Sequence, residues 1–167
     1  MAGIFIHEKH HLDKSLNRFE GWWGHNKKER FKMAPVFDPI PTAEAWQLSN
    51  PPMYLMASLK SSLQIFDEAT MPRIAKKRDH ITSYLEFLLK TKLKEFIQIQ
   101  TPTERGSMLC LKVKNKPEDV LKKLKERGVT VDFREPDILR MTPIPLYNSY
   151  QDCFLLSEIL EEIFSVS

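Results

Sequence analysis

Glycine, cysteine and long apolar runs are all scarce in this chain of 167 residues. The five glycines form neither the G-x-G-x-x-G nor the G-x-x-x-x-G-K spacing, which excludes the two common phosphate-binding loops. The two cysteines, Cys110 and Cys153, form neither a C-x-x-C pair nor a zinc-binding spacing. We therefore expect no disulfide framework, and a reducing, cytoplasmic location fits this composition.

Membrane and nucleic-acid partners are not expected either. No apolar run approaches the roughly 18 residues that a membrane helix needs, and the N-terminus lacks the pattern of a signal peptide. The 25 basic and 22 acidic residues leave a net charge of only +3, which demands neither nucleic acid nor an anionic membrane. A hydrophobic fraction of 42% is enough for a packed core, so the chain is globular rather than disordered.

The first 52 residues show little periodicity. Residues 2–6 predict a short buried strand, but a lone strand is seldom stable. Five prolines follow between residues 35 and 52, and an irregular stretch of this length is uncommon inside a compact domain. We expect residues 1–52 to be either the remnant of a larger domain or long arms that pack on a partner chain.

Residues 53–167 predict an α+β domain. Apolar residues recur at helical spacing in four segments, near 53–66, 70–90, 117–127 and 149–164. They alternate with polar residues, as in half-buried strands, near 96–100, 108–113, 129–133 and 138–141. The resulting order ααββαββα predicts a short, mostly antiparallel sheet covered by helices mainly on one face.

Helix ends in this part of the chain carry recognisable signals. Ser49 or Asn50 can cap the first helix, whose first turn tolerates the two prolines that follow. Thr70 with Pro72 marks the start of the second helix, and Ser149 with Asp152 resembles a capping pair for the last one. The basic run at 76–78 predicts a solvated helix face, because acidic residues interrupt it and no aromatic residues interleave for stacking.

Several residues have both a structural and a functional interpretation. Trp22 and Trp23, between two glycines and before His25, are either a buried loop plug or a ligand contact through an indole N–H. Asn50 precedes a helix start, which caps the helix and also exposes N–H groups that attract anions such as phosphate. Arg140 is either a solvated edge residue or a planar fork for a carboxylate, which Arg suits better than Lys.

The histidines are a weaker candidate. His7, His10, His11 and His25 could form a metal cluster, but they share no predictable face and no acid–histidine motif accompanies them. Solvated or locally hydrogen-bonded histidines are the better interpretation, and no metal is expected.

Six motifs, in one order along the chain, together resemble kynureninase from near its middle to its C-terminus. They are IFIHEKH at 4–10, GWWGH at 21–25, RFKM at 30–33, LSNPP at 48–52, SLQIF at 62–66 and RMTPIPLYNS at 140–149. Each motif is weak alone, but the set spans nearly the whole chain.

The resemblance implies a fold and an activity. The family is similar to the aspartate-aminotransferase type of pyridoxal-phosphate (PLP) enzymes, which are homodimers with active sites at the subunit interface. Its members hydrolyse L-kynurenine or 3-hydroxykynurenine to an anthranilate and L-alanine in tryptophan catabolism. By this resemblance, 1–52 is the remnant of the large PLP-binding domain and 53–167 is the small C-terminal domain. The lysine that binds PLP covalently lies before the segment matching 2–6, so the chain alone is expected to be inactive.

The resemblance also implies residue roles. Trp22 matches the tryptophan that contacts the cofactor phosphate from the neighbouring subunit, and Asn50 matches a cofactor-site residue that borders the substrate ring. Arg140 matches the arginine that holds the substrate α-carboxylate. Trp23 and His25 lie beside the ring pocket by the same analogy.

A free-standing interaction module is the alternative. The ββαββ segment could bind a peptide or single-stranded RNA. However, RNA binding calls for paired aromatic residues on one strand face, and the strands offer only Phe96 and Phe133, with no pair within one strand.

Overall fold

The computed structural model describes residues 3–33 and 35–165. The chain divides into two compact units, Met1–Ile65 (unit 1) and Phe66–Ser167 (unit 2). The division falls within helix α1, Met53–Ala69. Among the described residues, no helix is long and apolar enough to cross a membrane.

Unit 2 confirms the predicted α+β class and element order. After α1 come α2 (Met71–Lys92), β1 (Ile97–Ile99), β2 (Leu109–Val113), α3 (Pro117–Glu126), β3 (Asp132–Arg134), β4 (Ile138–Met141) and α4 (Tyr150–Ser165). The strands form one antiparallel sheet in the order β1-β2-β4-β3. Because β4 lies between β2 and β3, the α3 connection joins two parallel strands that are not neighbours, which is a split βαβ arrangement.

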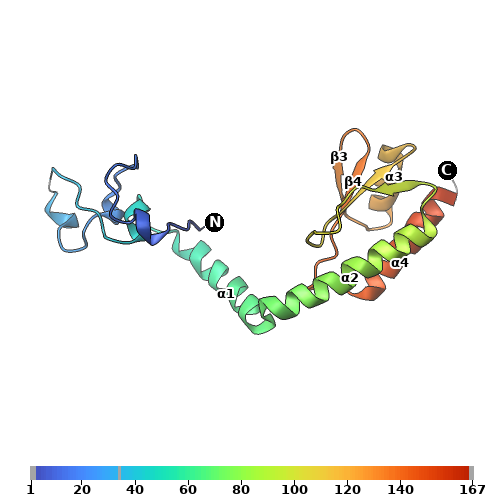
Figure 1. Ribbon diagram of the computed structural model, residues 1–167, viewed down its shortest axis with the longest axis horizontal. Coiled ribbons are helices and arrows are strands. Elements are labelled where there is room, and N and C mark those ends of the chain that lie inside the picture. The colour runs from blue at the N-terminus through green and yellow to red at the C-terminus, as the bar shows by residue number, and fades with distance from the viewer. Residues whose placement is uncertain (1–2, 34, 166–167) are drawn as a thin grey trace. The chain divides into compact units, whose positions relative to one another are not determined.

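The core of unit 2 lies between the sheet and its three helices. Leu111 of β2 and Leu139 of β4 face α2 and α4, which lie side by side against the sheet (Figure 1). Val120 and Leu124 of α3 join the same cluster. Burying apolar surface in this way is the main favourable term in folding. The alternation seen in the sequence therefore decides which face of each strand is covered.

Helix boundaries follow the local chemistry. α1 and α2 are separated at Thr70, whose φ is 58°, and Pro72 lies in the first turn of α2, where a missing N–H costs nothing. α3 is followed by Gly128 at φ 75°, a conformation that glycine adopts without strain. The predicted capping pair is confirmed: Asp152 N donates to Ser149 Oγ at 3.2 Å and Ser149 N donates to Asp152 Oδ2 at 2.8 Å.

Unit 1 is irregular, as the prolines predict. Its described part holds four 3₁₀ turns, Glu8–His10, Trp22–Gly24, Arg30–Lys32 and Ala43–Trp46. Where residues 3–6 are described they form no strand, so the strand prediction is wrong there, and residue 2 lies outside the described part. Ile4 and Phe5 are 69% and 86% exposed, so these apolar side chains are not packed against the other described residues.

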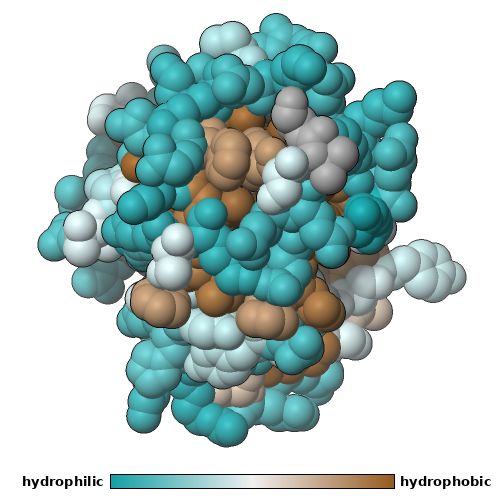
Figure 2. Space-filling model, turned by 90° about the vertical axis from the view of Figure 1, so that its right-hand side faces the viewer, coloured by the Kyte–Doolittle hydropathy of each residue, from teal (hydrophilic) through white to brown (hydrophobic). Residues whose placement is uncertain are grey.

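Helix α1 begins after Pro51 and Pro52 rather than around them. Its first backbone bond runs from Met56 N to Pro52 O at 3.0 Å, so the predicted cap at Ser49 or Asn50 lies outside the helix. All residues of α1 are described and none is buried. Figure 2 instead faces unit 2, where hydrophilic residues cover most of the surface and hydrophobic ones show near the middle of the view.

Candidate functional site

The two adjacent tryptophans form a tight turn in unit 1. Trp22 and Trp23 occupy a 3₁₀ turn that closes with a hydrogen bond from His25 N to Trp22 O at 3.3 Å. Their rings meet edge to face, with centroids 5.4 Å apart. Trp22 remains 44% exposed, so the interpretation of this residue as a fully buried plug does not hold. An exposed indole in a fixed turn is suited to contact a ligand.

Two glycines bring this turn against the segment that precedes Asn50. A Cβ on Gly21 would lie 2.1 Å from Cα of Leu48, and one on Gly24 would lie 2.5 Å from the carbonyl oxygen of Ala45. Only glycine permits such a close approach. The backbone next to Trp22 therefore packs against Leu48, and Asn50 follows Leu48 by two residues.

The donors on these two residues are unoccupied within the described part of the chain. Asn50 is exposed and its side chain makes no hydrogen bond to another described residue, and the same holds for the indole N–H of Trp22. Both side chains are exposed and can donate hydrogen bonds to a ligand.

Arg30 holds the turn together, a role that the sequence analysis did not assign. Its Nη2 donates to the carbonyl oxygens of Trp23 and, at 3.3 Å, of His25. Its guanidinium lies 4.5 Å from the centre of the Trp23 ring, a cation–π geometry. Arg30 was visible as part of the RFKM motif, but nothing in the sequence placed it against the tryptophans.

His25 is buried and hydrogen-bonded locally. Its Nδ1 accepts from the backbone N–H of Asp38 at 3.1 Å, and its backbone forms an isolated bridge with Pro39. A cavity of about 270 Å³ is lined by Trp22, His25 and Arg30 among others. Trp22 and His25 are thus brought to one cavity of unit 1.

Two other histidines, His7 and His11, make local hydrogen bonds. His7 Nδ1 accepts from Lys9 N at 3.2 Å, and His11 Nε2 lies 3.0 Å from the carbonyl oxygen of Ile6. Among the described residues, no group of three His, Cys, Asp or Glu side chains is placed to hold a metal.

Arg140 lies in unit 2, on the sheet face opposite the helices. Strand alternation buries Leu139 and Met141 in the core and leaves Arg140 on the other face, with its side chain 29% exposed. The side chain is not simply solvated, because Nε and Nη2 both contact Oδ2 of Asp132. Cys110 is the register partner of Arg140 on β2, and Asp132 is its partner on β3.

Asp132 is the second residue whose role the sequence analysis missed. The hydrogen bond from Arg140 holds the pKa of the Asp132 carboxyl below its ordinary value, and the nearby charge of Arg134 acts in the same direction. The carboxylate therefore stays charged at neutral pH. The signal was available, because a hairpin centred on residue 136 pairs Asp132 with Arg140.

The segment after Arg140 is tied to helix α2. Lys77 Nζ donates to the carbonyl oxygens of Pro145 at 2.6 Å and Asn148 at 3.0 Å, and Asn148 Oδ1 accepts from Ile144 N at 2.8 Å. The prediction of a solvated face is wrong for Lys77, because this lysine satisfies carbonyl groups of a loop distant in the sequence. The part of the RMTPIPLYNS motif that follows β4 is thus an anchored loop.

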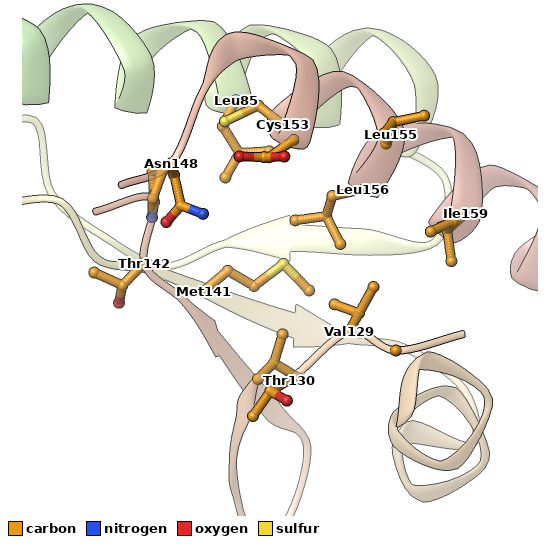
Figure 3. Close-up of a pocket in the computed structure, with 14 residues that line it drawn as sticks. Leu85, Val129, Thr130, Met141, Thr142, Asn148, Cys153, Leu155, Leu156 and Ile159 are labelled. Carbon is orange, nitrogen blue, oxygen red and sulfur yellow. The ribbon is translucent and has the colours of Figure 1, made fainter. Parts of the chain in front are cut away.

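A further cavity of about 380 Å³ lies on the helix side of the sheet, where Met141 and Leu156 point into it (Figure 3). Arg140 does not line it. Burial raises the pKa of the Cys153 thiol in its wall to about 11, so this thiol is neutral and unreactive near pH 7. The other ionisable side chain in its wall, Asp152, is engaged in the cap with Ser149.

The predicted site residues therefore fall into two groups. Trp22, Trp23 and His25 share one turn of unit 1, which packs beside the segment leading to Asn50, whereas Arg140 belongs to unit 2.

The family comparison places most of unit 2 in a known domain. The model of the kynureninase C-terminal domain matches residues 74–160. Among curated relatives, a kynureninase from Myxococcus xanthus strain DK1622 is 46% identical over 164 residues, covering 96% of this chain and 38% of that protein. A kynureninase from Flavobacterium johnsoniae is 44% identical over 167 residues, covering 96% of this chain and 39% of the relative. The chain thus spans about two-fifths of the length of these relatives.

Solved structures show the same fold at low identity. A complex of the cystine C–S lyase C-DES with its product cysteine persulfide superposes with a TM-score of 0.73 at 14% identity, over 88% of this chain and 39% of that one. A mutant of C-DES with glycine covalently linked to its PLP cofactor superposes with a TM-score of 0.70, also at 14% identity, over 87% of this chain and 38% of that one. The fold is that of part of a PLP enzyme of the aspartate-aminotransferase type. The chain belongs to the kynureninase family and contains its C-terminal domain.

Proposed function

We propose that this chain is the C-terminal part of a PLP-dependent hydrolase. The enzyme cleaves L-kynurenine, or its 3-hydroxy form, to anthranilate or 3-hydroxyanthranilate and L-alanine in tryptophan catabolism. Family membership and the kynureninase relatives support this proposal. The observation that carries it is Arg140, whose guanidinium is held on the open face of the sheet within the matching motif.

Arg140 binds the substrate α-carboxylate in this proposal. A guanidinium offers five N–H donors in a planar fork that matches a carboxylate. Fixing the carboxylate orients the rest of the substrate relative to the reacting bond, which lowers the barrier by positioning. Arg140 transfers no proton, because an arginine stays protonated in proteins.

Trp22 and Asn50 hold the cofactor. Trp22 contacts the phosphate of PLP, and Asn50 lies at the cofactor site and borders the substrate ring. When bound, PLP supplies an electron sink for the substrate's amino-bearing carbon. Trp23 and His25 lie beside the substrate ring. Nδ1 of the buried His25 accepts a hydrogen bond from Asp38 N. This bond fixes the orientation of the ring, which forms part of the pocket wall.

The remaining assignments belong to the same proposal. Residues 1–52 are part of the large PLP-binding domain and residues 53–167 form the small domain. The enzyme is a cytoplasmic homodimer that acts on a small molecule, with no nucleic-acid or membrane partner. The resemblance locates the lysine that binds PLP covalently outside these 167 residues, so we expect no turnover by this chain alone. The comparisons do not favour the alternative of a free-standing RNA or peptide module.

Turnover by a chimaera tests the proposal. This chain would replace the matching segment of the Myxococcus xanthus kynureninase, and anthranilate fluorescence would report hydrolysis of kynurenine. We expect turnover by the chimaera, loss of most of it in Arg140→Met, and none from the isolated chain. A chimaera that binds PLP yet hydrolyses neither kynurenine nor 3-hydroxykynurenine would overturn the activity. A folded chimaera that does not bind PLP would overturn the roles of Trp22 and Asn50.

A further inference from the structure

We propose that Asp132 is a positioning residue that locks the guanidinium of Arg140 so that its outer edge faces the substrate. The inference rests on the proposed role of Arg140 in carboxylate binding. It concerns a residue that touches neither substrate nor cofactor and acts only through Arg140.

The backbone register brings the two side chains together. Asp132 on β3 and Arg140 on β4 are direct partners in an antiparallel pair, and such partners have side chains on the same face about 5 Å apart. β3 and β4 are joined by a tight hairpin, so this placement does not depend on a distant part of the fold. The pair lies on the sheet face that the helices leave uncovered.

The contact uses one edge of the guanidinium. Arg140 Nε and Nη2 both donate to Oδ2 of Asp132, and this side edge is one of the two at which a guanidinium can offer paired donors. The outer edge, formed by Nη1 and the second hydrogen of Nη2, carries no contact to the other described residues. The outer edge is therefore free for a substrate carboxylate while Asp132 holds the side edge.

The acid is itself fixed. Arg134, two residues along on the same face of β3, donates from Nε to the same Oδ2 of Asp132 at 3.1 Å. Two cations therefore keep Asp132 ionised and restrict its rotation. An unrestrained arginine has several rotatable bonds, and ordering it on binding would weaken binding of the substrate. Because Asp132 already orders the Arg140 side chain, less conformational entropy is lost when the substrate binds.

Asp132 could instead compete with the substrate carboxylate for Arg140, and this role predicts the opposite change in KM. If Asp132 instead occupied the position of the substrate carboxylate, the substrate would have to displace it. Removal of its charge would then improve substrate binding. The two roles are separated by the sign of the change in KM.

Asp137 offers a matched control. It lies in the same hairpin and its carboxylate contacts Lys112 at 3.4 Å, so Asp137→Asn also removes an ion-pairing carboxylate from the hairpin but leaves the contacts of Arg140 in place. In this chain, the ¹⁵N–¹H signal of Arg140 Nε, identified by its loss in Arg140→Lys, should be slow to exchange. We expect Asp132→Asn to abolish that protection and Asp137→Asn to leave it. Equal protection in all variants would overturn the proposal, whatever the enzyme's activity.

Kinetics of the chimaera complete the test. We expect Asp132→Asn to raise KM for kynurenine about tenfold, with a smaller effect on kcat and no effect in Asp137→Asn. Inhibition by the decarboxylated amine analogue of kynurenine should not change, because that molecule has no carboxylate for Arg140. In Arg140→Lys, adding Asp132→Asn should cause little further loss.

The outcomes distinguish this inference from the function on which it rests. An unchanged or lowered KM in Asp132→Asn, in a chimaera where Arg140→Lys raises KM, would overturn the positioning role and leave the function intact. A chimaera that binds PLP without hydrolysing kynurenine would overturn the function, and the NMR comparison would still decide whether Asp132 restrains Arg140.

Discussion

Units 1 and 2 hold their shapes by different means. Unit 2 buries a contiguous apolar cluster between its sheet and three helices, whereas Ala45 is the one buried apolar residue within the described part of unit 1. Unit 1 relies on close backbone approaches at Gly21 and Gly24 and on the hydrogen bonds of Arg30. Hydrophobic periodicity thus specifies the fold of unit 2. The fold of unit 1 depends instead on individual residues that allow close backbone packing or bind carbonyl groups.

Helix α1, which contains the division, and the next helix, α2, show the same contrast. α2 buries Ile81, Leu85 and Leu89 among others, while α1 buries none of its residues although it carries many apolar ones. An apolar stripe at helical spacing therefore predicts a helix in both cases, but not whether this chain covers it.

The largest expected effect tests that contrast by truncating one leucine in each region. Leu139→Ala should lower the free energy of unfolding by about 2–5 kcal/mol, because a fully buried leucine leaves a cavity. Leu63→Ala in α1, where the side chain is 52% exposed, should change it by less than about 0.5 kcal/mol. Urea unfolding followed by far-UV circular dichroism measures both. Comparable losses would mean that α1 is covered in this chain.

A steric substitution probes unit 1. Gly21→Ala places a methyl group 2.1 Å from Cα of Leu48, and we expect a loss of about 1–3 kcal/mol from the forced backbone shift. The φ of Gly21 is −101°, so the cost is steric and not conformational. All three tryptophans, Trp22, Trp23 and Trp46, lie in unit 1, so tryptophan fluorescence follows this unit alone.

The control for the steric substitution is a glycine without neighbours. Gly3→Ala, also in unit 1, meets nothing within 4 Å and should leave the tryptophan transition unchanged. If Gly21→Ala were also silent, close backbone packing would not be what holds the tryptophan turn.

The smallest effect concerns charge in unit 2. Glu86 pairs with Lys90 at 2.6 Å and with Arg105, and its side chain is only 18% exposed. The hydrogen bond from Lys90 and the charge of Arg105 lower the pKa of Glu86 below its ordinary value, against the opposing effect of burial. The resulting stabilisation is fully present above the unfolded-state pKa, and is lost as pH falls through the lowered folded-state pKa.

Glu86→Gln should therefore destabilise unit 2 by about 1–2 kcal/mol at pH 7, and the difference from wild type should shrink in acid. Glu162→Gln, which removes the exposed pair with Arg127, should cost less than about 0.5 kcal/mol. Urea unfolding at several pH values measures both. A Glu86→Gln difference that grew as pH fell would contradict the sign of this linkage.

Sequence reasoning succeeded where the signal is local or periodic. The element order of unit 2, the Thr70–Pro72 break and the Ser149–Asp152 cap depend on residues a few positions apart, and all are confirmed. It failed at residues 3–6, where an apolar run predicts a strand but none of the described residues pairs with it as a strand. It also failed at Lys77, whose acceptors lie in a loop about seventy residues away.

The candidate site divides in the same way. The motif resemblance singled out Trp22, Asn50 and Arg140, and their roles remain proposals. Only the structure shows the contacts of Arg30 with the Trp23 carbonyl and of Asp132 with Arg140. The second contact could have been predicted, because a hairpin centred on residue 136 pairs Asp132 with Arg140.

The amino-acid sequence alone determined the α+β class, the order of elements and the face of each strand that is buried. Hydrophobic periodicity and turn preferences depend on residues a few positions apart. They show which side chains are buried without showing which residues cover them. Only the tertiary structure decided which edge of the Arg140 guanidinium is held by Asp132, and how closely Gly21 approaches Leu48. Those arrangements depend on ångström-scale distances between segments apart in the sequence, which hydrophobic patterns do not encode.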